Sequence, residues 1–354
     1  MMSQSFALYR LPGASEPILV EGSIEQIPAL TYLNHQKGFL LAPFQTKGTQ
    51  PIILIHPDST LQGWDEIHRH LLTNSDLHVH TSVKDYQTNM DKEEELRLKY
   101  NQAFDRFIAE LRSGRFEKLV LSRSAELDVN PQLDDFEFRA FEKACKIYPN
   151  MMVTYVHTPA TGSWIGSTPE IIISGHGHEW RTVALAGTML KQEGQEPEWS
   201  EKNKREQAFV SEYIETVLSQ FTDEVNLKGP YTSLAGHLVH LKTDISFVLD
   251  DLSKFGEILE ALHPTPAVCG LPKKEAFDFI LANEGYDRTY YSGIIGWFDP
   301  EGQTDLFVNL RCMNYDKSKL RLFAGGGILP SSDVDSEWRE TQYKMNTMKS
   351  IIEL

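Results

Sequence analysis

The residue types best suited to chemistry lie near the C-terminus, where Glu337, Glu340 and Lys344 occur at positions i, i+3 and i+7. In a helix this spacing places all three on one face. Met348 and Ile351 continue the face, so we expect it to point inward. Buried carboxylates need a partner, and a divalent metal with an anionic ligand would supply one. The alternative is an ordinary intrahelical Glu340–Lys344 pair on a solvated surface.

A glycine run before this helix favours the first interpretation. The sequence alternates like a buried strand at residues 320–324 and continues with Gly325, Gly326 and Gly327. Asp333 then provides a good N-cap for the helix. We expect the glycines to form a turn whose bare backbone amides can approach an anionic ligand.

A further carboxylate stands at the head of the clearest amphipathic helix, residues 200–221. Apolar residues recur along this segment at helical spacing, and Glu206 lies on the same stripe, with Asn203 one turn earlier. A buried carboxylate there must be paired, protonated or metal-bound. The alternative is a partly buried first-turn glutamate that the helix dipole stabilises.

Two more titratable groups begin predicted strands. Lys118 starts the short apolar strand at residues 118–123, although a strand lysine often serves only to prevent edge pairing. Glu170 starts a strand that ends at residue 174, directly after a predicted turn at residues 162–169, which ends with Pro169.

Arg311 lies on a predicted buried strand, residues 305–312, and should require an anion there. His78 and His80 share one face of another possible strand. Their spacing alone is a weak metal signal, because no third ligand accompanies them at a convincing distance.

The elements that must position these residues alternate between strands and helices. Further strands are predicted at residues 39–44, 51–55, 151–157, 183–187, 237–243 and 290–297, and further helices at 91–112, 254–262 and 272–282. Residues 263–272, HPTPAVCGLP, are too rich in proline for a regular element.

Composition narrows the classes of function. The chain has 354 residues and a net charge of −16, which argues against nucleic acid or an anionic membrane as a partner. No apolar run is long enough to span a membrane, and the N-terminus does not resemble a signal peptide. Three scattered cysteines favour the reducing cytoplasm. An anionic substrate would therefore need a locally basic or metal-bearing pocket.

A set of motifs in fixed order resembles the chorismate-utilising enzymes, which include isochorismate, salicylate, anthranilate and aminodeoxychorismate synthases. The motifs are KLVLSR, GSTPE, LAGT, KNKRE, HPTPAVCGLP, EGYDR, YYSGIIGW, VNLRC, GGGI and EWRETQYK. The resemblance covers residues 94–354, the chorismate-binding catalytic region, whereas residues 1–93 match loosely as a short N-terminal part of the same domain. It implies an α+β fold: a single large domain of two packed mixed β-sheets with helices outside and a site between the sheets.

The resemblance also implies roles for individual residues. Glu206 and Glu340 correspond to Mg²⁺ ligands and Glu337 to an accessory acid, whereas Asn203 stands where many members carry an acidic residue. Lys118 corresponds to the base of the water-adding members, and Glu170 to the acid. The groups implied to bind substrate are Arg311, Lys344, Tyr291, the amides of Gly325 and Gly326, and the ring-pocket residues Gly187, Thr188, His240 and Ala267.

Residues 264–270, PTPAVCG, resemble the loop of isochorismate synthases from menaquinone and siderophore pathways. Anthranilate synthases generally lack the base lysine, and no glutamine amidotransferase domain is found, so water is the expected nucleophile. The resemblance therefore implies a Mg²⁺-dependent isochorismate synthase that acts on chorismate and isochorismate as a monomer or weak dimer. One alternative is a salicylate synthase, which goes on to remove pyruvate from isochorismate. The other is a chorismate-binding protein without turnover, and Asn203 is the feature that favours it.

Overall fold

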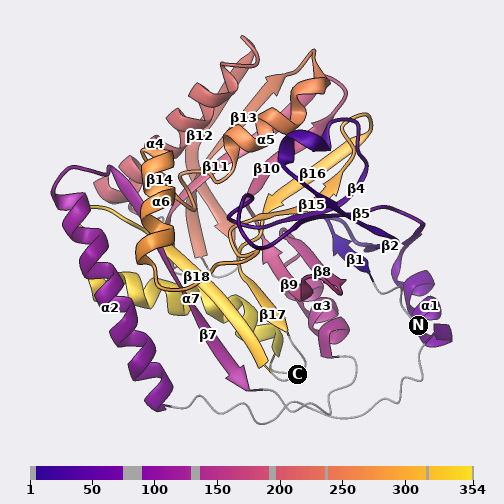
Figure 1. Cartoon of the computed structure of the whole chain (residues 1–354), viewed down its shortest axis with the longest axis horizontal. Coiled ribbons are helices and arrows are strands. Elements are labelled where there is room, and N and C mark those ends of the chain that lie inside the picture. Colours follow the sequence, from indigo (N-terminus) through magenta and orange to yellow (C-terminus); the bar gives the residue numbers. More distant parts are fainter. Residues whose placement is uncertain are drawn as a thin grey trace.

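Two β-sheets of nine strands each make up the frame of the described chain (Figure 1). The computed structural model describes residues 5–74, 90–128, 136–190, 197–235, 238–315 and 319–352. In spatial order the first sheet contains β14 (Gly270–Leu271), β7 (Lys118–Asp128), β18 (Lys319–Ile328), β17 (Cys312–Tyr315), β9 (Gly162–Thr168), β8 (Met152–Thr158), β1 (Phe6–Arg10), β2 (Ile18–Glu21) and β6 (Ser59–Gln62).

The second sheet receives strands from the N-terminal, middle and C-terminal parts of the chain. In spatial order it contains β12 (Val225–Ala235), β13 (Leu238–Val248), β11 (Glu179–Leu190), β10 (Ile171–His176), β16 (Gln303–Val308), β15 (Ile294–Phe298), β4 (Gly38–Ala42), β5 (Ile52–Ile55) and β3 (Ile24–Ile27). The N-terminal strands β1 to β6 are thus divided between the two sheets.

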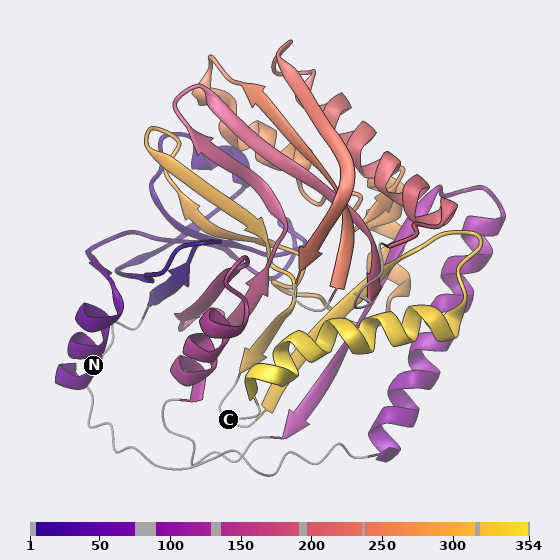
Figure 2. The same cartoon turned by 180° about the vertical axis from the view of Figure 1, so that it is seen from behind.

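Helices lie on the outer faces of the sheets. They are α1 (Trp64–Asn74), α2 (Met90–Arg112), α3 (Phe136–Ile147), α4 (Glu201–Leu218), α5 (Phe255–Leu262), α6 (Lys273–Asn283) and α7 (Val334–Ile352), with short 3₁₀ turns at Leu30–Leu33 and Leu252–Lys254. Figure 2 shows α7, in yellow, lying across β18 and β7. None of the helices in the described ranges is long and apolar enough to cross a membrane.

The two-sheet α+β fold predicted from the sequence is confirmed, but the sheets are not mixed. Every strand pairing in the described part of the chain is antiparallel. Antiparallel neighbours can be joined by tight turns, as β8 and β9 are between Thr158 and Gly162, whereas parallel pairs need a long crossover.

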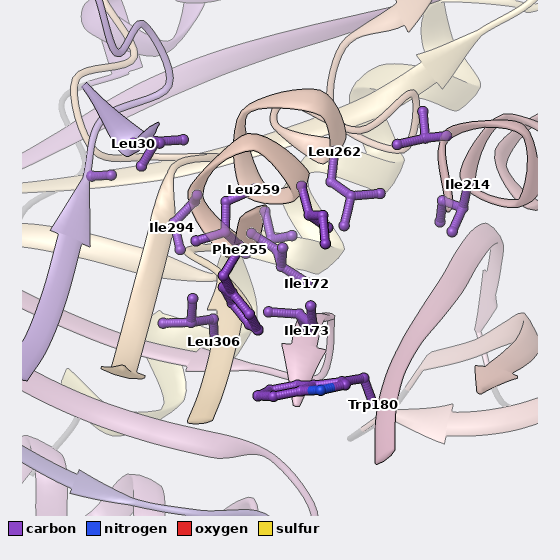
Figure 3. Close-up of a cluster of buried hydrophobic side chains, with 14 of the residues drawn as sticks. Leu30, Ile172, Ile173, Trp180, Ile214, Phe255, Leu259, Leu262, Ile294 and Leu306 are labelled. Atoms are coloured by element: carbon purple, nitrogen blue, oxygen red, sulfur yellow. The ribbon is translucent and has the colours of Figure 1, made fainter. Parts of the chain in front are cut away.

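Apolar side chains fill the layers between each sheet and its helices, and the layer between the two sheets. Figure 3 shows one cluster in which α5 packs on the second sheet, with the ring of Phe255 edge-on to Trp180 at a centroid distance of 4.7 Å. A different cluster contains Phe39 from the second sheet together with Trp164 and Phe323 from the first. Because it draws side chains from both sheets, this cluster fixes one sheet against the other.

One predicted turn is a strand. Residues 163–168 form most of β9, which pairs with β8 on one side and β17 on the other. The serines and glycines of this segment are typical of turns, but Trp164 and Ile165 are fully buried, and small neighbours allow close packing between two strands. The predicted strand at residues 290–297 is also shorter, because β15 begins only at Ile294.

Candidate active site

The site is built around two points at which the chain crosses from one sheet to the other. The first crossing follows β9 and places Glu170 before β10, and the second follows β16 and places Arg311 before β17. Hydrogen bonds join the crossings, because Thr168 Oγ1 donates to the Val308 carbonyl at 2.7 Å and the Val308 amide donates to the Glu170 carbonyl at 2.9 Å. The Ser167 amide donates to the Arg311 carbonyl at 3.0 Å. The carboxyl of Glu170 and the guanidinium of Arg311 are thus carried on adjacent segments.

Arg311 is not part of a continuous strand, which corrects the prediction for residues 305–312. Strand β16 ends at Val308, and Arg311 has a φ of +46°. A positive φ is uncommon for a residue with a long side chain, and such strain is often found at functional sites. Strand alternation was therefore the wrong guide to the direction of this side chain.

A cavity opens beside the two crossings. Most of the substrate-binding residues predicted from the sequence line it, together with two of the other predicted site residues: Glu170, Gly187, Glu206, His240, Ala267, Tyr291, Arg311, Gly325, Gly326 and Lys344. Thr188 lies in β11 opposite His240 in the strand register, but its side chain is outside the described residues, as are His78 and His80. Apolar walls with a few charged and polar groups are typical of a site for a small ligand.

The three glycines are part of a strand, so the predicted glycine turn is wrong. Gly325, Gly326 and Gly327 lie within β18 and face Ser122, Leu121 and Val120 of β7 in the register of the ladder. The turn preference of glycine is overridden because pairing with β7 continues through the run.

The glycines provide space for carboxylates. A Cβ on Gly327 would lie 2.1 Å from Oε1 of Glu206, and a Cβ on Gly326 would lie 3.3 Å from both Glu337 Oε2 and Glu340 Oε1. Side chains from α4 and α7 can therefore meet over this strand only because it lacks side chains of its own.

Each of the three carboxylates is paired with a lysine. Lys118 Nζ lies 3.1 Å from Glu206 Oε1, and Lys344 Nζ lies 2.7 Å from Glu340 Oε1. The intrahelical pair considered from the sequence therefore exists, and its lysine lines the cavity and donates to the Gly325 carbonyl at 2.9 Å. The third pair joins Lys202 to Glu337. We did not expect Lys202 at the site, although its position four residues before Glu206 places it on the same helix face.

The surroundings of the buried carboxyl groups shift their pKa values in different directions. Burial alone would raise the pKa of Glu206, but Lys118 and Lys202 outweigh it and hold that pKa below its ordinary value. Burial, reinforced by the neighbouring Glu340, raises the pKa of Glu337. Burial also raises the pKa of Glu170 to about 7, against the opposing effect of Lys118 and other cations. Glu170 can therefore carry a proton near neutral pH, while Glu206 is ionised.

The carboxylate oxygens are suitable ligands for a hard divalent cation such as Mg²⁺. Glu337 Oε2 is buried with no hydrogen-bond partner, on the side facing the space above Gly326. In the described ranges, no group of three or more acidic, histidine or cysteine side chains is already drawn together as ligands. Glu206, Glu337 and Glu340 are therefore a fitting donor set whose members are held by lysines in this structure.

Gln207, which the sequence analysis did not single out, anchors α4 beside the cavity. Its Oε1 accepts from the Ala186 amide at 2.8 Å, and its Nε2 donates to the Ala184 carbonyl at 2.9 Å. Nε2 also lies 3.0 Å from Thr243 Oγ1. This buried amide fixes the helix that carries Glu206 against the strand that carries Gly187.

A second unexpected group supports the opposite wall. Glu284 Oε1 accepts from the Ser122 amide at 2.7 Å and forms a buried ion pair with Arg288. Arg288 donates to the carbonyls of Val120, at 2.9 Å, and Val268, at 2.7 Å. The loop at residues 264–270 is thereby tied to the strand that begins with Lys118.

The fold and the site together place a cavity lined by cationic and acidic side chains between two sheets. The chain matches the family described as "Chorismate binding enzyme" over residues 49–353, and it belongs to that family. The resemblance seen in the sequence motifs is thus confirmed.

Individual relatives agree with this assignment. The chain is 29% identical over 264 residues to the isochorismate synthase EntC of Escherichia coli, covering 72% of this chain and 67% of that protein. It is 32% identical over 254 residues to the salicylate biosynthesis isochorismate synthase of Pseudomonas aeruginosa, covering 69% of this chain and 52% of that protein. The structure of MenF, the menaquinone-specific isochorismate synthase from Escherichia coli, shares the fold with a TM-score of 0.81 at 20% identity, over 99% of this chain and 89% of that one.

Proposed function

We propose that this protein is an isochorismate synthase, which converts chorismate reversibly to isochorismate. The names of the similar proteins support this choice within the family. The observation that carries it is that the cavity holds both the buried carboxyl of Glu170, whose pKa is raised to about 7, and the guanidinium of Arg311. The product would enter a pathway that consumes isochorismate, as menaquinone or siderophore biosynthesis does.

Substrate binding rests on the positive groups of the cavity. Chorismate carries two carboxylates, and the protein has a net charge of −16, so local cations must hold the ligand. Arg311 and Lys344 both line the cavity, and a guanidinium can bind a carboxylate through two parallel hydrogen bonds. Tyr291 also lines the cavity and stacks on Phe323, with ring centroids 5.4 Å apart.

Glu206 and Glu340 would hold Mg²⁺, with Glu337 beside them. When bound, the ion would neutralise a substrate carboxylate next to the acidic side chains. Asn203 adds no negative charge to this set.

The chemistry exchanges one ring hydroxyl for another supplied by water. Lys118 would take a proton from the incoming water, and Glu170 would give a proton to the departing hydroxyl. A water is consumed and a water is released, so the reaction is an isomerisation. In the reverse direction the two residues exchange roles, and Lys118 is fully buried, away from bulk water.

The test is to incubate the purified protein with chorismate and Mg²⁺ and to separate the products by chromatography. We expect isochorismate as the main product, an equilibrium reached from either side, and loss of turnover in excess chelator that added Mg²⁺ restores. Salicylate and pyruvate as main products would identify a salicylate synthase instead. Stoichiometric chorismate binding without any product would identify a binding protein.

A further inference from the structure

Lys202 is the one lysine of the carboxylate cluster to which the proposed chemistry gives no task. It lies on α4, and its ammonium contacts Oε1 of Glu337 on α7. The Glu337 side chain is only 3% exposed, whereas that of Lys202 is 26% exposed. The pair therefore bridges two helices, with the carboxylate fully inside and the lysine reaching it from the rim.

The local charges show what this pair does. Glu206, Glu337 and Glu340 are matched by Lys118, Lys202 and Lys344, so three negative groups meet three positive groups. Burial lowers the pKa of Lys202, but Glu337, Glu206 and Glu340 outweigh that effect and raise it overall. In these three ion pairs the charges cancel, so the cluster has no net charge to attract a divalent ion.

Only one of the two carboxylate oxygens of Glu337 has a hydrogen-bond partner. Lys202 and Ser332 Oγ, the latter at 2.7 Å, both contact Oε1, whereas Oε2 is buried without a hydrogen-bond partner. Oε2 lies on the Gly326 side, where Glu340 Oε1 is equally close to the glycine. A cation placed there would meet the free oxygen of Glu337 while the ammonium still held the other oxygen.

We propose that Lys202 is an internal cation that competes with Mg²⁺ for the charge of Glu337 and so weakens the affinity of the metal site. The inference rests on the proposed function for the identity of the ion. Removing the ammonium leaves the cluster with one net negative charge and takes one of the two partners from Oε1 of Glu337, which keeps the hydrogen bond from Ser332, and both changes favour a divalent cation.

The experiment measures binding of Mg²⁺ by isothermal titration calorimetry to the full chain without substrate. Lys202→Met should bind Mg²⁺ about tenfold more tightly than the wild type, or more. Lys204→Met is the matched control, because Lys204 lies two residues away on the same helix and pairs with the exposed Glu201 at 2.8 Å. It removes the same charge from the protein and should leave the affinity within about twofold.

A second background separates competition at Glu337 from a general effect of charge. In Glu337→Gln, adding Lys202→Met should give no more than a small gain, because the carboxylate for which the two cations compete is gone. Thermal unfolding shows whether Lys202→Met is folded. If it is not, Lys202→Gln, which retains a polar side chain at the rim, takes its place and should show the same tighter binding.

The outcomes are distinct. Equal or weaker Mg²⁺ binding by the folded Lys202 variants, relative to Lys204→Met, would overturn the inference while leaving the proposed function in place. Binding by the Lys202 variants but not by the wild type would support strong competition. No binding by any variant would overturn both the inference and the metal part of the proposed function, whereas the product analysis tests the reaction itself.

Discussion

Arg311 donates a hydrogen bond from Nη2 to Nε2 of His240 at 2.7 Å. A guanidinium has only donors, so this ring nitrogen must be the unprotonated acceptor. The proton of the neutral ring is then on Nδ1, which donates to the Gly187 carbonyl at 3.2 Å. Burial, with Arg311 and Lys344 nearby, holds the pKa of His240 well below its ordinary value. His240 therefore orients the guanidinium and carries no charge of its own.

This arrangement predicts that Arg311→Lys will bind substrate poorly although the charge is kept. The single ammonium of a lysine cannot contact His240 and, at the same time, form two parallel hydrogen bonds to a carboxylate. We expect KM for chorismate to rise by the equivalent of ~1–3 kcal/mol, as for loss of a charged hydrogen bond. Steady-state kinetics at saturating Mg²⁺ measure it. An unchanged KM would mean that Arg311 serves only to hold the two sheet crossings together.

Glu170→Gln should lower kcat by about 10²–10⁴, the usual contribution of a positioned acid or base. The amide has the shape of the neutral acid but cannot donate a full proton. Because the pKa of Glu170 is raised to about 7, the carboxyl keeps its proton below pH 7 and loses it above. In the wild type kcat/KM should therefore fall as the pH rises through about 7, and the Gln variant should lack this alkaline limb.

Protein stability provides an independent check of the same group. Between the ordinary value of 4.5 and about 7, the folded protein holds a proton on Glu170 that the unfolded chain has released. The free energy of unfolding contributed by this group should therefore decrease as the pH rises through that window. Denaturant unfolding of wild type and Glu170→Gln at pH 5 and pH 8 compares the two. An equal change in both proteins would indicate that the carboxyl is not perturbed.

The glycine run gives a graded prediction. A methyl group on Gly327 would lie 2.1 Å from Glu206 Oε1, whereas one on Gly326 would lie 3.3 Å from Glu337 Oε2 and Glu340 Oε1. Gly327→Ala must displace the Glu206 carboxylate, so we expect Mg²⁺ to bind more weakly by about tenfold or more. Gly326→Ala should have the smaller effect, and calorimetric titration of both variants would reveal the order. The reverse order would show that Glu206 is not at the centre of the metal site.

The sequence predicted which residues meet, but not how the backbone brings them together. Helical spacing correctly placed Glu206 and Glu337 on buried helix faces, because the period of a helix is fixed by its geometry. Strand alternation failed at Arg311, since nothing local indicates where a chain leaves one sheet for another. The glycine turn was wrong because pairing with a distant strand overrode local preference. Lys202 was missed because its partner Glu337 is 135 residues away.

Lys118→Ala tests the assignment of the base. Lys118 is the first residue of β7, fully buried, and its ammonium lies 3.1 Å from Glu206 Oε1. The substitution removes the group proposed to take a proton from water, whereas Arg311, Lys344, Glu337 and Glu340 keep their places. We expect chorismate binding to be nearly intact and kcat to fall by ~10²–10⁴. Rapid-quench or steady-state assays, with binding measured separately, distinguish the two effects.

Small primary amines provide the sharper form of this test. The substitution leaves a space the size of a lysine side chain next to Glu206, and an amine that enters it could restore part of the rate. Rescue should increase with the concentration of the neutral amine, so at fixed total amine it should rise with pH. The pH profile of kcat/KM in the unrescued variant should lose its acidic limb and keep the alkaline limb that we assign to Glu170. A variant with near-normal rate and both limbs would mean that another residue activates the water. The ion pair with Glu206 would then be the whole role of Lys118: a buried counter-charge for a carboxylate, with no part in proton transfer.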